Sequence, residues 1–255
     1  MTARRSLLAA LKPLASHLGL HIVPSWRRES EPFANHLSRL FSLLAIDGVL
    51  DIGANRGQYR DFLRNETGYR GRIDSYEPIP DLAAELRTRS QADSAWETYG
   101  EALDIKEGTR SFSVMVNREF SSFLEPDDSH FDALRALNCV ERRIDVDTIT
   151  LQRAIERARL GGASRLYVKL DTQGHDLSIL QACPDALSGV PALQTEASVT
   201  QLYEGMPKYS EVFDWLGHLG FDLSGIFPNN TGHFPWLIEF DAILINRRFL
   251  ARDDT

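Results

Sequence analysis

The residues best suited to chemistry lie around a glycine turn at positions 53–57, which reads Gly-Ala-Asn-Arg-Gly. The apolar stretch 49–52 before it predicts a strand that is buried on both faces. Gly53 and Gly57 have no Cβ, so the backbone can bend sharply there and come close to a ligand. We therefore predict a strand, a ligand-binding turn, and a helix that starts near Gly57.

A second strand is predicted over residues 72–77, and it ends in Glu77. In nucleotide-binding βαβ units an acid at this place, roughly 20 residues after the turn, bonds the hydroxyls of a ribose. A dinucleotide site also needs glycine at position 55, where this chain has Asn55, so an NAD-type oxidoreductase is a disfavoured alternative. The spacing Asp-x-Gly-x-x-x-Gly, from Asp51 to Gly57, is instead typical of S-adenosylmethionine (SAM) methyltransferases. A plain connecting turn of an α/β protein is the other interpretation.

Acidic residues stand at the ends of four predicted strands: Asp51, Glu77, Asp171 and Glu196. In doubly wound sheets, ligands bind outside the carboxyl ends of the strands. A single acid of this kind could simply cap the following helix, whereas four on one rim indicate a site. Glu101 follows a further predicted strand, where it could face an adenine amino group or be a solvated acid.

Composition bounds the class of protein. The chain has 255 residues, of which 43% are hydrophobic and 25% charged, and this suits one large α/β domain. The formal net charge of -8 argues against a nucleic-acid partner, which needs a basic surface. Two cysteines, Cys139 and Cys183, form neither a disulfide framework nor a metal-type pair, so we expect a reducing, cytoplasmic location.

The chain divides into a predicted N-terminal helical segment, residues 1–46, packed on a domain that covers residues 47–250. Leucines at positions 7, 11, 14 and 18 form one stripe of an amphipathic helix, which would pack on the domain or contact a membrane surface. No apolar window is long enough to predict a transmembrane helix. Helices are predicted over 36–46 and 147–160, and the loops 117–129 and 229–236 are candidates to cover the cofactor and the substrate.

Over roughly residues 41–249, the chain resembles the FkbM family of SAM-dependent methyltransferases, because several characteristic segments follow one another in the family's order. The resemblance is carried by residues 50–59, Tyr76-Glu77-Pro78, residues 100–103, Ser121-Ser122-Phe123-Leu124, residues 168–174 and residues 202–205. It implies a Rossmann-like α/β fold with a seven-stranded, mostly parallel sheet, helices on both faces and a reversed C-terminal hairpin. With SAM as the cofactor, we predict that it is bound by Asp51, Gly53, Ala54, Asn55, Gly57, Gln58, Glu77, Glu101 and Ser122.

The resemblance also implies methyl transfer to a hydroxyl oxygen, often on a sugar of a glycolipid or natural product. A non-sugar small molecule such as a polyketide is the alternative acceptor. An alcohol must lose a proton as it attacks, and His175, whose type has an unperturbed pKa near 6.5, is our predicted base. Asp171, about one helical turn earlier, would orient His175 or bind the acceptor hydroxyl. His175 could instead be only a polar residue on the first turn of a helix.

A metal-assisted variant is possible but not favoured. Asp171, Glu196 and Asp241 are oxygen ligands of the type that suits Mg²⁺, and a bound Mg²⁺ would acidify the acceptor hydroxyl. The sequence does not show whether these three side chains converge.

Overall fold

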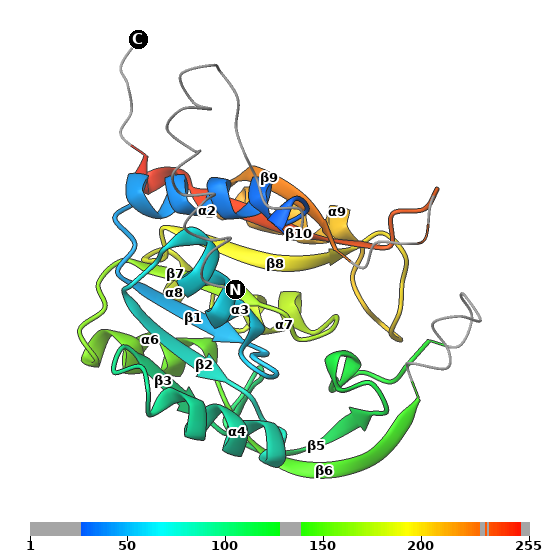
Figure 1. Ribbon diagram of the computed structural model, residues 1–255. Helices are drawn as coiled ribbons and strands as arrows, with labels where there is room; N and C mark the ends of the chain where they lie inside the picture. The colour runs from blue at the N-terminus through cyan, green and yellow to red at the C-terminus, as the bar shows by residue number, and fades with distance from the viewer. Residues whose placement is uncertain (1–26, 128–138, 230–232, 234, 251–255) are drawn as a thin grey trace.

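The computed structural model describes residues 27–127, 139–229, 233 and 235–250. Its centre is a seven-stranded sheet with the order β3-β2-β1-β7-β8-β10-β9 (Figure 1). The strands are β1 (Gly48–Ile52), β2 (Arg72–Tyr76), β3 (Trp96–Tyr99), β7 (Leu166–Leu170), β8 (Ala192–Ser198), β9 (Phe221–Asn229) and β10 (Glu239–Asn246). All pairs are parallel except those that β10 makes with β8 and β9. The predicted Rossmann-like fold with a reversed last hairpin is confirmed.

The middle of the sheet is formed by β1 and β7, which are buried at every position. Their apolar side chains point to both faces, with Leu50 and Val168 paired in register and inaccessible to solvent. Strands that are covered on both faces need such continuous apolar runs. The strand order reverses between β1 and β7, because the chain leaves β1 towards one edge of the sheet and β7 towards the other. Ligands of doubly wound sheets bind at this switch point.

Helices cover both faces of the sheet (Figure 1). One face carries α6 (Leu151–Leu160), α7 (Asp176–Gln181), α8 (Pro184–Leu187) and α9 (Tyr209–His218), whose apolar residues share one core cluster with the strands. The other face carries α2 (Glu31–Leu43), α3 (Gln58–Phe62) with its π-helical continuation Leu63–Thr67, and α4 (Pro80–Ser90). In α6 the buried residues Leu151, Ala154, Ile155 and Ala158 recur at helical spacing, which is the pattern of an amphipathic helix.

The helix α2 begins earlier than the predicted start at residue 36, because Pro32 fits the first turn of a helix. Its buried residues Leu37, Leu40 and Phe41 pack in the same core cluster as Ile243 of β10. Residues 27–46 of the predicted N-terminal segment therefore pack on the sheet. The predicted leucine stripe at positions 7–18 lies outside the described residues. No helix in the described part of the chain is long and apolar enough to cross a membrane.

A second, three-stranded sheet was not predicted. It consists of β4 (Ala102–Leu103), β6 (Val140–Ile149) and β5 (Gly108–Met115), in that order, and it packs against Ile79 and Leu82 at the start of α4. The predicted start of a helix at residue 147 is wrong, because β6 runs on to Ile149. The hydroxyl of Thr150 then caps α6 by accepting a hydrogen bond from the amide of Arg153 at 3.2 Å.

We expect Gly57→Ala to lower the free energy of unfolding more than Gly68→Ala. Both glycines have a left-handed backbone, with φ of +80° and +78°, which costs an L-residue about 1–2 kcal/mol. A Cβ at residue 57 would also lie 3.1 Å from Leu86 and 3.2 Å from Trp96, whereas a Cβ at residue 68 would meet open space. The added crowding should cost about 1–3 kcal/mol more. Urea denaturation of both variants measures the difference, and equal losses would contradict this account.

Candidate active site

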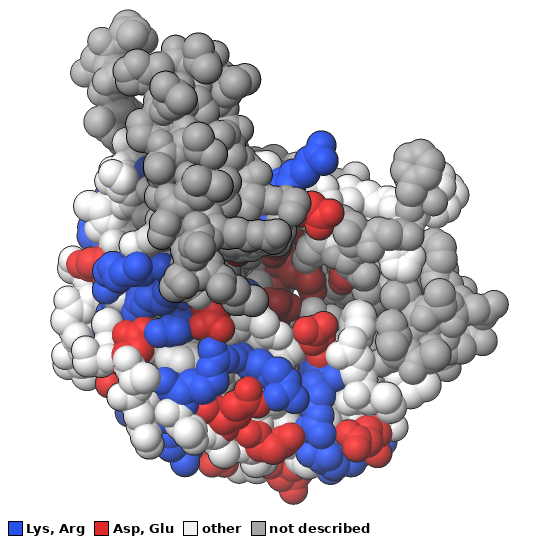
Figure 2. All heavy atoms as spheres, in the orientation of Figure 1, with Lys and Arg blue, Asp and Glu red and all other residues white. Residues whose placement is uncertain are grey.

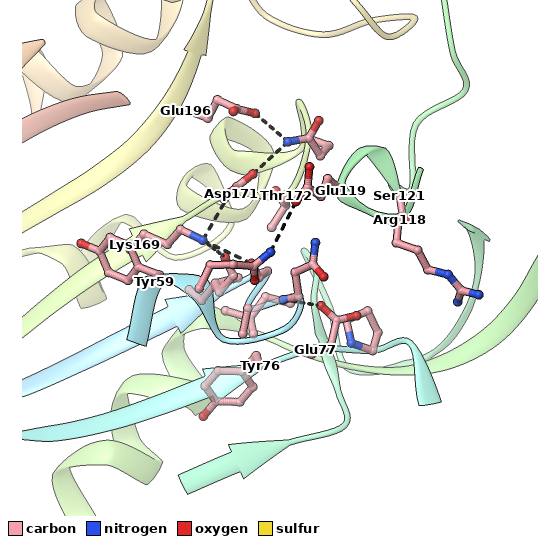
Figure 3. A pocket seen from close by; sticks show the side chains of 18 of the residues that line it. Tyr59, Tyr76, Glu77, Arg118, Glu119, Ser121, Lys169, Asp171, Thr172 and Glu196 are labelled. Carbon is pink, nitrogen blue, oxygen red and sulfur yellow. Dashed lines mark hydrogen bonds and ion pairs between the residues drawn. The ribbon is translucent and has the colours of Figure 1, made fainter. Parts of the chain in front are cut away.

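A cavity of about 510 Å³ opens beside the switch point, at the carboxyl ends of β1, β7 and β8 (Figures 2 and 3). In Figure 2 it is a hollow whose inner wall carries acidic side chains. Among the predicted site residues, those that line it are Gly53, Ala54, Asn55, Gln58, Glu77, Glu101, Asp171, Glu196 and Asp241. The rim of strand-end acids predicted from the sequence therefore meets at one cavity, with the exception of Asp51.

The glycine turn forms one wall of the cavity. Gly53 has a φ of +77°, and a Cβ at this position would overlap the backbone carbonyl oxygen of Asp171. Asn55 also has a left-handed backbone, with a φ of +47°, and its backbone N–H donates a hydrogen bond to the carboxylate of Glu77 at 2.8 Å. The turn therefore carries a side chain at residue 55. This side chain occupies the position that must be glycine where a pyrophosphate approaches.

Glu77 is held rigidly at the end of β2. One carboxylate oxygen accepts a hydrogen bond from Asn55, and the other accepts one from the amide of Ile79 at 2.9 Å. Burial raises the pKa of Glu77 to about 7, and the two backbone amides oppose that rise. A carboxylate has about four lone-pair sites, so both oxygens can still accept hydrogen bonds from ligand hydroxyls.

Three residues predicted to bind the cofactor do not line the cavity. Asp51 is fully buried beneath the turn, where it accepts a hydrogen bond from Ser75 at 3.0 Å. Gly57 is needed for its backbone shape and its close packing. Ser122 is also buried, and its hydroxyl donates to the carbonyl of Gln173 at 2.9 Å, whereas its neighbour Ser121 does line the cavity. These three residues therefore support the residues that line the cavity and do not line it themselves.

Glu101 lines the cavity, but its carboxylate is engaged. Arg157 donates hydrogen bonds to both oxygens of Glu101, and its guanidinium lies 4.4 Å from the centre of the Tyr99 ring. The charge of Glu101 is therefore paired within the protein, so it is not the freely solvated acid of the alternative interpretation. A contact with an adenine amino group stays a prediction.

The far end of the cavity brings together carboxylates from three strands. Asp171 follows β7, Glu196 belongs to β8 and Asp241 belongs to β10. The amide of Gln173 donates to Asp171 at 2.9 Å and to Glu196 at 2.8 Å, and so joins two of them. Within the described residues, however, no three His, Cys, Asp or Glu side chains are arranged to hold a metal ion.

Two of these acids have raised pKa values. Burial raises the pKa of Glu196 well above its usual range, and the nearby carboxylates of Asp171 and Glu239 raise it further. Burial also raises the pKa of Asp241, to about 6, although the amide of Gln194 donates to it at 2.9 Å and opposes the rise. Strongly shifted carboxylates in a cleft are typical of functional sites.

His175 does not lie where a base would need to be. Its side chain is buried, lies outside the cavity lining and forms a 2.8 Å hydrogen bond through Nε2 with Asp104. Burial favours the neutral form of Asp104, but the bonds from His175 and from the amide of Ile105 outweigh it and lower the pKa of this acid. The ring also meets Phe123 edge-on. The prediction that His175 and Asp171 face the acceptor together is therefore wrong for His175.

Several cavity residues had no role assigned from the sequence. Lys169 of β7 and Gln194 of β8 lie on the sheet face covered by α2 and α3. Tyr59 of α3 faces them, and its hydroxyl donates to Gln194 at 2.7 Å. The sequence did carry one signal, because Lys169 interrupts the apolar strand 166–170. A charged residue inside a buried strand is rarely buried without a partner. Tyr59 and Gln194 gave no comparable signal.

The fold and this cavity define a Rossmann-like protein in which a glycine turn and a strand-end acid, Glu77, line one cavity. A family model described as the methyltransferase FkbM domain matches residues 51–223, and the chain belongs to this family. The protein is therefore a methyltransferase, and its cofactor is SAM. The missing glycine at residue 55 and the family together set aside the oxidoreductase alternative.

Solved structures also align with the chain at low identity. Cofactor-bound Rv0187 from MTB has 12% identity and a TM-score of 0.47, with 94% of this chain and 89% of that chain covered. Magnesium protoporphyrin IX methyltransferase from Synechocystis PCC 6803, with bound SAM, has 11% identity and a TM-score of 0.42, with 87% and 89% covered. Aeropyrum pernix fibrillarin, with natively bound SAM, has 12% identity and a TM-score of 0.43, with 78% of this chain and 66% of that chain covered. No curated protein matches the chain significantly.

The residues present fit SAM. Gly53 and Ala54 have little or no side chain and so leave room for its amino-acid part beside Asn55, and Glu77 offers acceptors for its ribose. The acidic wall suits its positive charge. When bound, SAM supplies a methyl group that is already activated by its sulfonium.

We expect SAM affinity to weaken as the pH falls from about 8 to 6. Glu77 has a raised pKa of about 7, so it gains a proton in this range, and the neutral acid accepts hydrogen bonds from ribose hydroxyls less strongly. Glu77→Gln should weaken binding roughly 10-fold or more and flatten the pH dependence. Calorimetric titration across this range measures both. A wild-type affinity in Glu77→Gln would remove Glu77 from the binding site.

Proposed function

We propose that the protein transfers the methyl group of SAM to a hydroxyl oxygen of a sugar, carried by a glycolipid or a glycosylated natural product. The observation that carries this proposal is the make-up of the cavity beyond the glycine turn. Figure 3 shows Glu196 above and Glu77 below, with Asp171 between them in height and Lys169 to one side. The end near Glu196 remains for an acceptor.

This end combines carboxylates with amides. Glu196, Asp241 and Asp171 can accept hydrogen bonds, and Gln194 and Asn229 can both donate and accept. Sugar hydroxyls are themselves donors and acceptors, so such a wall can bond several of them. A site of this kind also favours acceptors with hydroxyls over those without them, because only the former add hydrogen bonds to its polar groups.

Aromatic rings complete the wall. Phe33 and Phe62 stack at 5.0 Å between ring centres, and Tyr59 lies 6.0 Å from Phe62. All three line the cavity. Their faces suit the apolar C–H faces of a sugar ring, and they would equally suit a flat polyketide. The polar wall is the reason to prefer the sugar.

Asp241 is our proposed general base. Its pKa of about 6 leaves it mostly ionised near neutral pH, and a base with a pKa close to the working pH is the most effective. Glu196 accepts hydrogen bonds from Gln173 and Asn229, and burial and the nearby carboxylates raise its pKa well above the usual range, so we assign it to holding the acceptor. Asp171 is paired with Lys169 at 3.3 Å and accepts a hydrogen bond from Gln173 at 2.9 Å, so its carboxylate is already engaged with the protein.

In this mechanism the chain does three things. The turn and Glu77 hold the cofactor, and the carboxylates and amides near Glu196 fix the acceptor so that one hydroxyl oxygen faces the methyl group. Such positioning supplies much of the rate enhancement in transfer reactions. Asp241 takes the hydroxyl proton as the oxygen attacks. Asp171 would bind a neighbouring hydroxyl of the acceptor.

A methyl-transfer assay tests the proposal with matched acceptors. We expect SAM consumption with a glycolipid or a glycosylated natural product, and mass spectrometry should locate the added methyl on a sugar oxygen. The same compounds without the sugar should not react, and the reaction should continue in EDTA. Methylation of the sugar-free polyketide instead would overturn the sugar proposal, and loss of activity in EDTA would restore the metal-assisted variant.

We expect Asp241→Asn to lower kcat roughly 10²-fold or more, because it removes the proposed proton acceptor. SAM affinity should stay close to that of the wild type. The matched variant is His175→Asn, which changes a residue outside the cavity; it should lower the melting temperature but keep most of the kcat of the folded protein. The opposite result, with a large kcat loss only in His175→Asn, would return the role of base to His175.

A further inference from the structure

Lys169 is a buried cation at the switch point of the sheet. Its side chain is 6% exposed. The ammonium lies 3.3 Å from Asp51 and 3.3 Å from Asp171, and it donates to the carbonyl of Gly53 at 3.2 Å (Figure 3). It also lies 5.4 Å from the centre of the Tyr59 ring. Removing such a charge from water costs several kcal/mol, so this many partners are needed to keep it.

These contacts join separate parts of the chain. Asp51 belongs to β1, Gly53 to the glycine turn, and Asp171 to the segment that follows β7. The amide of Asp171 also donates to the carbonyl of Ile52 at 3.1 Å, so the two strand ends touch directly. The carbonyl oxygen of Ile52 also lies 3.5 Å from the ammonium, so two carboxylates and two carbonyl oxygens surround it. Without a cation among them they would repel one another.

The positive charge of Lys169 is more than balanced by the carboxylates around it. Its single positive charge faces two carboxylates, and the group of three carries a formal net charge of -1. Burial opposes the charged ammonium, but Asp171 and Asp51 more than compensate and raise the pKa of Lys169. The lysine therefore stays charged, and it is engaged with the protein rather than free to bind an anionic group of a ligand.

We propose that Lys169 is a positioning residue for SAM: its ammonium fixes the carbonyl of Gly53 and the carboxylate of Asp171, and so sets the shape of the wall against which the cofactor lies. The proposal rests on the cofactor and is independent of the acceptor. The proposal gives Asp51 and Lys169 different roles. Asp51 balances charge, whereas Lys169 holds the atoms at the cavity surface.

A double-mutant cycle with Asp51→Asn and Lys169→Met tests this role. Methionine keeps most of the length of lysine but has neither the charge nor the donors. Lys169→Met changes the formal net charge of the group formed by residues 51, 169 and 171 from -1 to -2. The double variant Asp51→Asn/Lys169→Met keeps this charge at -1. The double variant therefore has the wild-type local charge without the donor. Binding of SAM and of its demethylated product is measured by calorimetry, and stability by thermal denaturation.

We expect Lys169→Met to weaken SAM binding at least tenfold in both the wild-type and the Asp51→Asn backgrounds. The loss of melting temperature should be clearly smaller in the Asp51→Asn background, because the charge is then balanced. If Lys169→Met alone does not fold, the comparison of Asp51→Asn with the double variant carries the test. SAM affinity that is equal in those two proteins would overturn the proposal, since Lys169 would then serve only charge balance. No acceptor is present, so failure here leaves the proposed acceptor chemistry untouched, and the converse also holds.

Discussion

The close approach of two strand ends governs the rest of this structure. At the switch point the glycine turn after β1 packs against the backbone that follows β7, so closely that a Cβ on Gly53 would overlap the carbonyl of Asp171. Only glycine permits this contact together with a left-handed backbone. The contact brings polar backbone groups close to the buried carboxylate of Asp51 and to Asp171, whose side chain is 35% exposed at the cavity. Lys169 is the counter-charge that makes the burial of Asp51 tolerable.

Charged side chains also determine the character of the cavity next to this contact. Beyond Asp171 the cavity wall is acidic, and burial and mutual repulsion raise the pKa values of Glu196 and Asp241 by different amounts. Acids in one cavity can therefore differ in how tightly they hold a proton, and so serve different purposes. The side-chain amide of Gln194 accounts for part of this difference, because its hydrogen bond lowers the pKa of Asp241. The same wall suits a positively charged cofactor and an acceptor rich in hydroxyls.

The second sheet gives the cavity its other side. It packs on α4, and the short helix Arg118–Phe120 after β5 adds side chains to the lining. His175 belongs to the same structural connection, since its bond to Asp104 ties the start of α7 to the residue that follows β4. A histidine that lies one helical turn after a site aspartate thus has a structural task, which its sequence position did not reveal.

The sequence by itself determined the sheet, the glycine turn and the rim of acids. Apolar runs such as 49–52 and the spacing of Gly53 and Gly57 are local features, and the carboxyl ends of parallel strands must meet at one edge. The tertiary structure alone decided which polar side chains face the cavity and which are buried or bonded to other parts of the protein. Asp51 faces inward, Glu101 pairs with Arg157, and His175 pairs with Asp104. Partners of this kind come from 56 and 71 residues away along the chain for Glu101 and His175, and no local pattern encodes such distances. The direction in which a side chain points and the charge it meets depend on packing, which the chain settles only when it folds.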